Sequence, residues 1–149
     1  MLPAQPMISV MGGEEPITIG FDAPAAYHGQ AALAMLAITF QGLRATLPIL
    51  SPNAPAQRAA IFRSQRTSWP GVRDAFEFVT RGVTRNEYIV DRTLPEARLN
   101  PAADLSYSFV ISLKGRSARA ALQEGILPAR FFERDIPTSR ESCRGLFPR

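Results

Sequence analysis

One stretch of the sequence constrains the fold more than any other. Residues 27–46 are predicted to form a long helix, because alanine, leucine, methionine and glutamine there favour helical structure. One apolar face has residues three and four apart, namely Ala32, Met35, Leu36, Phe40 and Leu43. Leu33, Ala37 and Ile38 add a second apolar face. A helix that is apolar on nearly all sides is buried, either in a core or at a contact between subunits.

Shorter elements follow this helix and set the expected fold class. Alternating apolar and polar residues predict strands, spacings of three and four predict helices, and prolines and glycines predict the breaks. The expected strands are 16–21, 58–65, 87–91 and 105–114, the further helices 68–79 and 118–124 with a helical turn at 127–133, and the breaks 48–55, 80–86 and 93–104. Hairpin-like and crossover connections alternate, which predicts an α+β fold: a small mixed or antiparallel sheet packed against a long buried helix and two shorter helices. A doubly wound nucleotide fold is disfavoured, because no strand leads into a glycine-rich phosphate loop.

The length of 149 residues suits one domain. We expect a single α+β domain over 1–134 and a polar tail over 135–149. The first residues lack the basic and apolar regions of a signal peptide, and the longest apolar stretch, 31–40, is too short to span a membrane. These features predict a cytoplasmic protein that does not associate with membranes.

The single histidine and single cysteine limit metal chemistry. One cysteine excludes an intramolecular disulfide and a cysteine-based zinc cluster, and one histidine excludes a two-histidine site within one chain. We therefore expect no metal site, and the sequence identifies no cofactor. Cys143 has an arginine beside it that could activate the thiol, but its place in the polar tail favours an incidental role.

The histidine itself is the first candidate functional residue. His28 follows Tyr27 at the start of the predicted long helix, where free N–H groups can hold an anion and a histidine can act as a base or a hydrogen-bond donor. Asp22 is close enough in sequence to orient its ring, and Trp69 and Asp74 at the next helix could line a pocket with it. Two simpler explanations stay open: His28 packs or caps a helix, and Asp74 is stabilised by the helix dipole.

A second candidate is the predicted turn over 80–86. Arg81 and Arg85 flank Gly82 and could bind a carboxylate or phosphate bidentately, with Thr84 between them, although a solvated basic turn is the alternative. The chain as a whole carries 17 Lys and Arg against 13 Asp and Glu, for a net charge of +4. Acidic residues are interspersed among the arginines and no nucleic-acid motif is present, so nucleic-acid binding is disfavoured.

Three segments, in order, resemble the N-terminal domain of the formylmethanofuran dehydrogenase E family. They are Tyr-His-Gly at 27–29, Gly-Val-Arg-Asp-Ala-Phe-Glu-Phe-Val-Thr-Arg-Gly-Val-Thr at 71–84 leading to Asn-Glu-Tyr-Ile-Val-Asp at 86–91, and Tyr-Ser-Phe-Val-Ile-Ser-Leu-Lys-Gly-Arg-Ser-Ala-Arg at 107–119. The resemblance covers roughly residues 20–125. It implies an α+β fold, an intertwined dimer, and a link to one-carbon or molybdoenzyme metabolism.

This chain departs from the family at the metal-binding positions. The second histidine of the family falls at Gln30, the cysteine before its Gly-Val-Asp-Ala segment corresponds to Pro70, and the cysteine of its Thr-Gly-Cys-Thr turn is missing. The metal chemistry of the family therefore does not carry over. His28, Asp74 and Thr84 match by position.

Three functional hypotheses follow. The leading one is a small cytoplasmic binding or accessory protein of this family, homodimeric and with the metal site lost; the apolar long helix suggests the dimer, because two such helices can bury each other. The second is an enzyme in which His28 is the general base, oriented by Asp22 or Asp74, while Arg81 and Arg85 hold a small anionic or pterin-like substrate. The third is an arginine-mediated binder of nucleic acid or another anionic partner.

Overall fold

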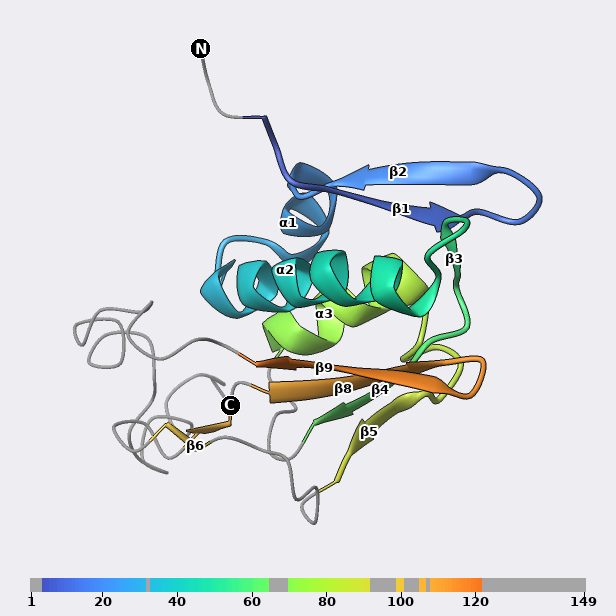
Figure 1. Ribbon diagram of the computed structural model, residues 1–149. Coiled ribbons are helices and arrows are strands. Elements are labelled where there is room, and N and C mark those ends of the chain that lie inside the picture. Colours follow the sequence, from blue (N-terminus) through green and yellow to red (C-terminus); the bar gives the residue numbers. More distant parts are fainter. Residues whose placement is uncertain are drawn as a thin grey trace, which may run out of the picture.

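The chain forms a layer of helices between two sheets (Figure 1). The computed structural model describes residues 4–31, 33–64, 70–91, 99–100, 105–106 and 108–121. The first sheet has the order β2-β1-β3, with β1 at Met7–Met11, β2 at Pro16–Gly20 and β3 at Ala56–Gln57. The helices are α1 at Asp22–His28, α2 at Leu33–Leu50 and α3 at Pro70–Thr80. The predicted α+β class, with one long helix and two shorter ones, is confirmed.

The second sheet has the order β5-β4-β8-β9. Its strands are β4 at Ile61–Ser64, β5 at Tyr88–Val90, β8 at Ser108–Leu113 and β9 at Arg116–Ala121. β4 is parallel to β5 and antiparallel to β8, so this sheet is mixed, as expected. Two short strands, β6 at Leu99–Asn100 and β7 at Leu105–Ser106, pair separately.

The long helix α2 lies between the two sheets, which explains its two apolar faces. It packs against β1 and β3 on one side and against β8 and β9 on the other (Figure 1). Leu36, Phe40 and Leu43 are completely buried. Among the described helices α2 is the one long and apolar enough to cross a membrane, but a buried core helix has the same length and composition. The described residues of the first apolar face are buried inside one chain, so their burial does not require a second subunit. Leu33, Ala37 and Ile38 of the second face are half-buried.

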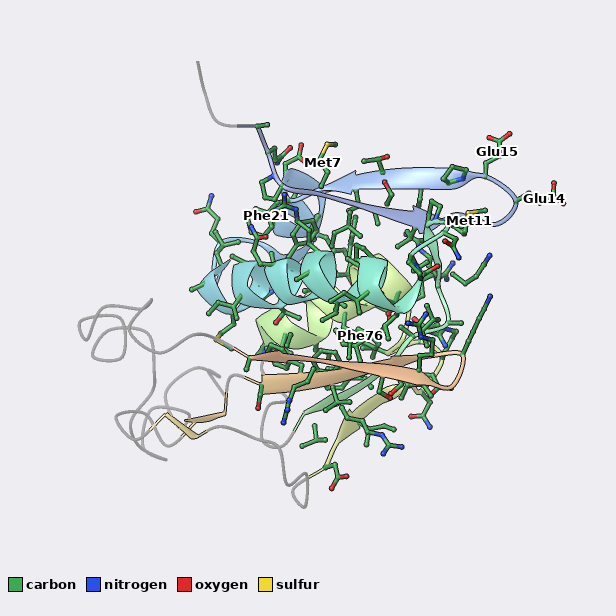
Figure 2. The ribbon with its side chains drawn as sticks, viewed as in Figure 1. Met7, Met11, Glu14, Glu15, Phe21 and Phe76 are labelled. Atoms are coloured by element: carbon green, nitrogen blue, oxygen red, sulfur yellow. The ribbon has the colours of Figure 1, made fainter. Side chains whose placement is uncertain are left out.

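Aromatic side chains join α3 to the second sheet. The ring centroid of Phe62 on β4 lies 4.8 Å from that of Phe76 on α3. It lies 5.0 Å from the ring centroid of Phe109 on β8 and 5.2 Å from that of Tyr88 on β5. Figure 2 places Phe76 at the boundary between the helices and this sheet. The cluster leaves no room at Gly82, because a Cβ built there would lie 2.0 Å from the Phe76 ring. Gly82 therefore belongs to the packing of the core.

The helix expected over 27–46 differs from the observed one at both ends. The helical conformation ends after His28, because Gly29 takes a φ of 87°. Gly29 thus ends α1 and begins a turn before α2. At the other end α2 continues through Pro48 to Leu50, so the loop expected from Pro48 is wrong. Pro48 is exposed, whereas Leu47 and Leu50 are buried. Their packing outweighs the hydrogen bond that the proline cannot donate.

The third helix expected, over 118–124, is also wrong: residues up to Ala121 form strand β9. Lys114 and Gly115 both have positive φ, 49° and 78°, which is the backbone of a tight two-residue hairpin. The hairpin pairs β9 with β8, and Ala118 and Ala120 pack against the core. Tertiary pairing thus overrides the helix preference of an alanine- and arginine-rich segment. Residues 122–124, the helical turn at 127–133 and the tail at 135–149 lie outside the described residues.

Candidate functional site

His28 is held at the C-terminal end of α1. The helix closes with a hydrogen bond from the Gly29 N–H to the Ala25 carbonyl at 3.0 Å. The last carbonyls at the end of a helix lack helical partners. The local sequence therefore places the one histidine of the chain at the C-terminal end of α1, and the expected place at the start of the long helix is wrong.

Both ring nitrogens of His28 contact hydrogen-bond acceptors. Nδ1 lies 2.6 Å from Oδ2 of Asp74, and Nε2 lies 2.5 Å from the carbonyl oxygen of Ala31. The His28 side chain is 4% exposed and that of Asp74 is 30% exposed. A carboxylate and a carbonyl both accept hydrogen bonds, so the two contacts are satisfied together when each ring nitrogen carries a hydrogen. In that form the bond to Asp74 is a charge-assisted hydrogen bond between two helices.

A second contact between α1 and α3 accompanies this ion pair. The ring of Tyr27 lies 5.6 Å from that of Phe78. Asp74 and Phe78 are four residues apart and share one face of α3, which meets the adjacent residues Tyr27 and His28. Asp22, predicted as one possible partner of His28, instead accepts a hydrogen bond from the Ala23 N–H at 2.9 Å.

Two arginines bind the opposite, C-terminal end of α3. Arg85 donates from Nη2 to the carbonyls of Ala60 at 3.1 Å and Thr80 at 3.2 Å. Arg58 donates from Nε to the carbonyl of Val79 at 3.0 Å and from Nη2 to the preceding carbonyl at 3.4 Å. Cations are favoured at a helix C-terminus, where the last carbonyls lack helical partners. Burial and the nearby charge of Arg81 lower the pKa of the Arg58 guanidinium.

The turn after α3 is closed by Glu77. Its Oε2 accepts a hydrogen bond from the Thr84 N–H at 2.9 Å, and its Oε1 accepts one from the Thr84 hydroxyl. Burial raises the pKa of Glu77, but the hydrogen bonds from Thr84 and Val83 and the charge of Arg81 outweigh it and lower the pKa. Arg81 itself is exposed with a φ of 57°, so it ends the helix. Thr84 and Arg85 both act here in holding the turn.

The predicted site residues therefore fall into two groups. Tyr27, His28 and Asp74 lie together where α1 meets α3, whereas Arg81, Thr84 and Arg85 lie beyond the far end of α3. Asp74 is followed by six more residues of α3, or about 9 Å of helix rise. The two groups do not converge on one site. Trp69 lies outside the described residues.

A groove that the sequence analysis missed lies elsewhere, beside β1. It has a volume of about 390 Å³ and is lined by β1, the second half of α2 and the segment over 51–56. The residues that line it are Met7, Ile8, Ser9, Arg44, Leu47, Pro48, Ser51, Ala54, Pro55 and Ala56. None of the predicted site residues is among them. The prolines at 48 and 55 are the local sequence feature that falls in this groove. The groove itself depends on the pairing of β3 with β1, two strands that lie far apart in the sequence.

In the part of the chain that the structure describes, no three His, Cys, Asp or Glu side chains gather as they would around a metal ion. No family model, curated protein or solved structure matches this chain. The resemblance to the formylmethanofuran dehydrogenase E family thus stays a prediction from the three sequence segments.

Proposed function

We propose that this chain is a small binding or accessory protein and that His28 and Asp74 form a structural ion pair. The supporting observation is that both nitrogens of a side chain only 4% exposed contact acceptors within the protein. A general base needs an unprotonated nitrogen within reach of a substrate proton. In the described part of the chain both ring nitrogens of His28 have acceptors, and Arg81 and Arg85, the predicted anion-binding residues, lie beyond the far end of α3.

The resemblance to the formylmethanofuran dehydrogenase E family supports a place in one-carbon or molybdoenzyme metabolism, in the cytoplasm, with the family's metal site lost. A homodimer remains part of the proposal on this resemblance alone, because α2 is already covered on two sides within one chain. The third hypothesis, an arginine-mediated binder of an anionic partner, loses support from the turn, because Arg85 donates to the backbone carbonyls of Ala60 and Thr80.

Acylation of His28 by diethyl pyrocarbonate tests this proposal. The reagent attacks a free imidazole nitrogen, and His28 is the only histidine, so the ultraviolet absorbance of the product reports one site. We expect the native protein to react at least about tenfold more slowly than N-acetylhistidine, because both nitrogens must first leave their partners. The Asp74→Asn variant should react faster than the native protein. A native rate equal to that of N-acetylhistidine would refute the structural role and restore the enzyme hypothesis.

A further inference from the structure

The groove beside β1 contains an open strand edge. β2 pairs with the whole of β1, from Met7 opposite Gly20 to Met11 opposite Pro16. On the other edge β3 pairs only with Val10 and Met11. Beside residues 7–9, no described strand takes up that edge, and the groove lies there instead.

The direction of the backbone groups follows from the ladder. The Pro6 carbonyl accepts a hydrogen bond from the Phe21 N–H at 3.2 Å, so the backbone groups of residue 6 point toward β2. Backbone groups alternate between the two edges of a strand. Met7 and Ser9 therefore direct their N–H groups, and Met7 its carbonyl, toward the open edge. Met7 is 52% exposed, and Ser9 is exposed too.

The rest of the groove combines apolar surface with one cation. Leu47 and Ile8 are buried apolar residues of its lining, and Arg44 is the only charged residue among the described residues that line it. Arg44 is exposed, and its described hydrogen bond runs to a neutral group, Oε1 of Gln41, at 3.2 Å. The acidic residues of the hairpin, Glu14 and Glu15, lie at its tip, at the opposite end from Met7 (Figure 2). The described lining thus has a positive charge and no carboxylate of its own.

We propose that this groove binds an extended, acidic peptide segment of a partner protein by adding it as a strand to the edge of β1 at residues 7–9. The proposal rests on the proposed binding function and specifies its ligand. An extended segment supplies the N–H and C=O groups that the open edge needs, and alternate side chains of the segment reach the apolar lining. A carboxylate on the segment pairs with Arg44.

A partner segment fits this edge better than a second copy of the chain. In a two-fold dimer formed edge to edge, each copy brings the same surface, and therefore its own Arg44, to the contact. The described lining of neither groove contains a carboxylate to pair with that added cation. A peptide that carries a glutamate supplies the missing charge.

Hydrogen exchange in the free protein tests the open edge first. We expect the amide hydrogens of Ile8 and Val10, which face β2, to exchange slowly, and those of Met7 and Ser9 to exchange at least about tenfold faster. Slow exchange at Met7 and Ser9 in the protein alone would overturn the proposal, since the edge would already be covered. If that protection grew with protein concentration together with the mass from light scattering, a second copy would be the occupant, and the peptide proposal would fall.

Binding is tested with two acetylated eight-residue probes of alternating valine and threonine, one with a central glutamate and one with a central lysine. We expect the glutamate probe to bind saturably by fluorescence anisotropy, to slow exchange at Met7 and Ser9, and to bind more tightly than the lysine probe. Arg44→Gln should weaken the binding of the glutamate probe about three- to fivefold and should not weaken the binding of the lysine probe. Arg73→Gln, an exposed arginine on α3, is the matched control and should change neither.

Ser9→Pro removes the edge N–H while sparing the ladder to β2, because proline is tolerated where the N–H faces away from the neighbouring strand. This substitution should weaken the binding of the glutamate probe about tenfold. If this variant does not fold, the Arg44→Gln comparison decides. Equal affinity of the two probes, or no binding of either, would overturn the groove proposal. The proposed function is judged separately, by the acylation of His28.

Discussion

Breaking the contact between His28 and Asp74 should cost a specific, measurable part of the stability. A hydrogen bond to a charged group contributes about 1.5–3 kcal/mol. The side chain of His28 is 4% exposed but that of Asp74 is 30% exposed, so water weakens the interaction and the lower half of that range applies. We therefore expect a coupling free energy of about 1.5–2 kcal/mol between the two side chains. His28→Ala alone should cost about 2–3 kcal/mol, because it also removes the contact with Ala31.

The assay is a double-mutant cycle of His28→Ala, Asp74→Ala and the double variant, measured by urea unfolding. Urea is preferred to guanidinium chloride because it is uncharged and does not screen the ion pair. Changes in helix propensity on substitution by alanine cancel in the cycle. Asp22→Asn is the matched control: it alters the carboxylate nearest to His28 in sequence, whose hydrogen bond is to its own neighbour, and should cost less than about 0.5 kcal/mol. A coupling below about 0.5 kcal/mol would refute the reasoning.

Two further predictions concern the far end of α3. Gly82→Ala should destabilise the protein by about 1–3 kcal/mol in urea unfolding, because the new Cβ would overlap the Phe76 ring. Gly42→Ala is the control and should be neutral or stabilising, because its Cβ would lie 3.5 Å from Ala120. Equal effects of the two substitutions would contradict this packing. Because the folded-state pKa of Glu77 is lowered, its stabilising contribution is present above the ordinary glutamate pKa of about 4.3 and is lost as the pH falls toward and below the lowered value. Glu77→Gln should therefore reduce stability at neutral pH and flatten its loss in acid; a variant with an unchanged acid profile would show that this carboxylate is not linked to folding.

The parts of the fold that the sequence predicts correctly carry strong local signals. The helix that begins near Pro70 and the strand at 16–21 appear as α3 and β2, because proline suits a first helical turn and alternation fits a half-buried strand. The helix expected at 118–124 fails because the positive φ of Lys114 and Gly115 makes a hairpin, and pairing with β8 then decides the conformation.

The candidate site is predictable only in part, for a related reason. The sequence analysis offers a pocket lined by Asp74 and His28 as one interpretation, and the two side chains do meet although they are 46 residues apart in sequence. They meet at the C-terminal end of α1, whereas the sequence predicts His28 at the start of a long helix. The binding of both ring nitrogens could not be foreseen, because Ala31 presents its carbonyl only once Gly29 has broken the helix. The groove beside β1 depends in the same way on β3, a strand of two residues paired across more than 40 positions, which no local pattern predicts.

The most direct test of the central claim is nitrogen-15 NMR of the imidazole ring of His28, the only histidine signal in the spectrum. In the form in which the ring carries both hydrogens, we predict two ring N–H signals, both protected from exchange with water, and a nuclear Overhauser contact from the Nδ1 hydrogen to protons of Asp74. The Asp74→Ala variant should lose the protection at Nδ1 first. If either ring hydrogen exchanges with water as fast as in a free histidine, that nitrogen is open to solvent and the structural ion pair is contradicted.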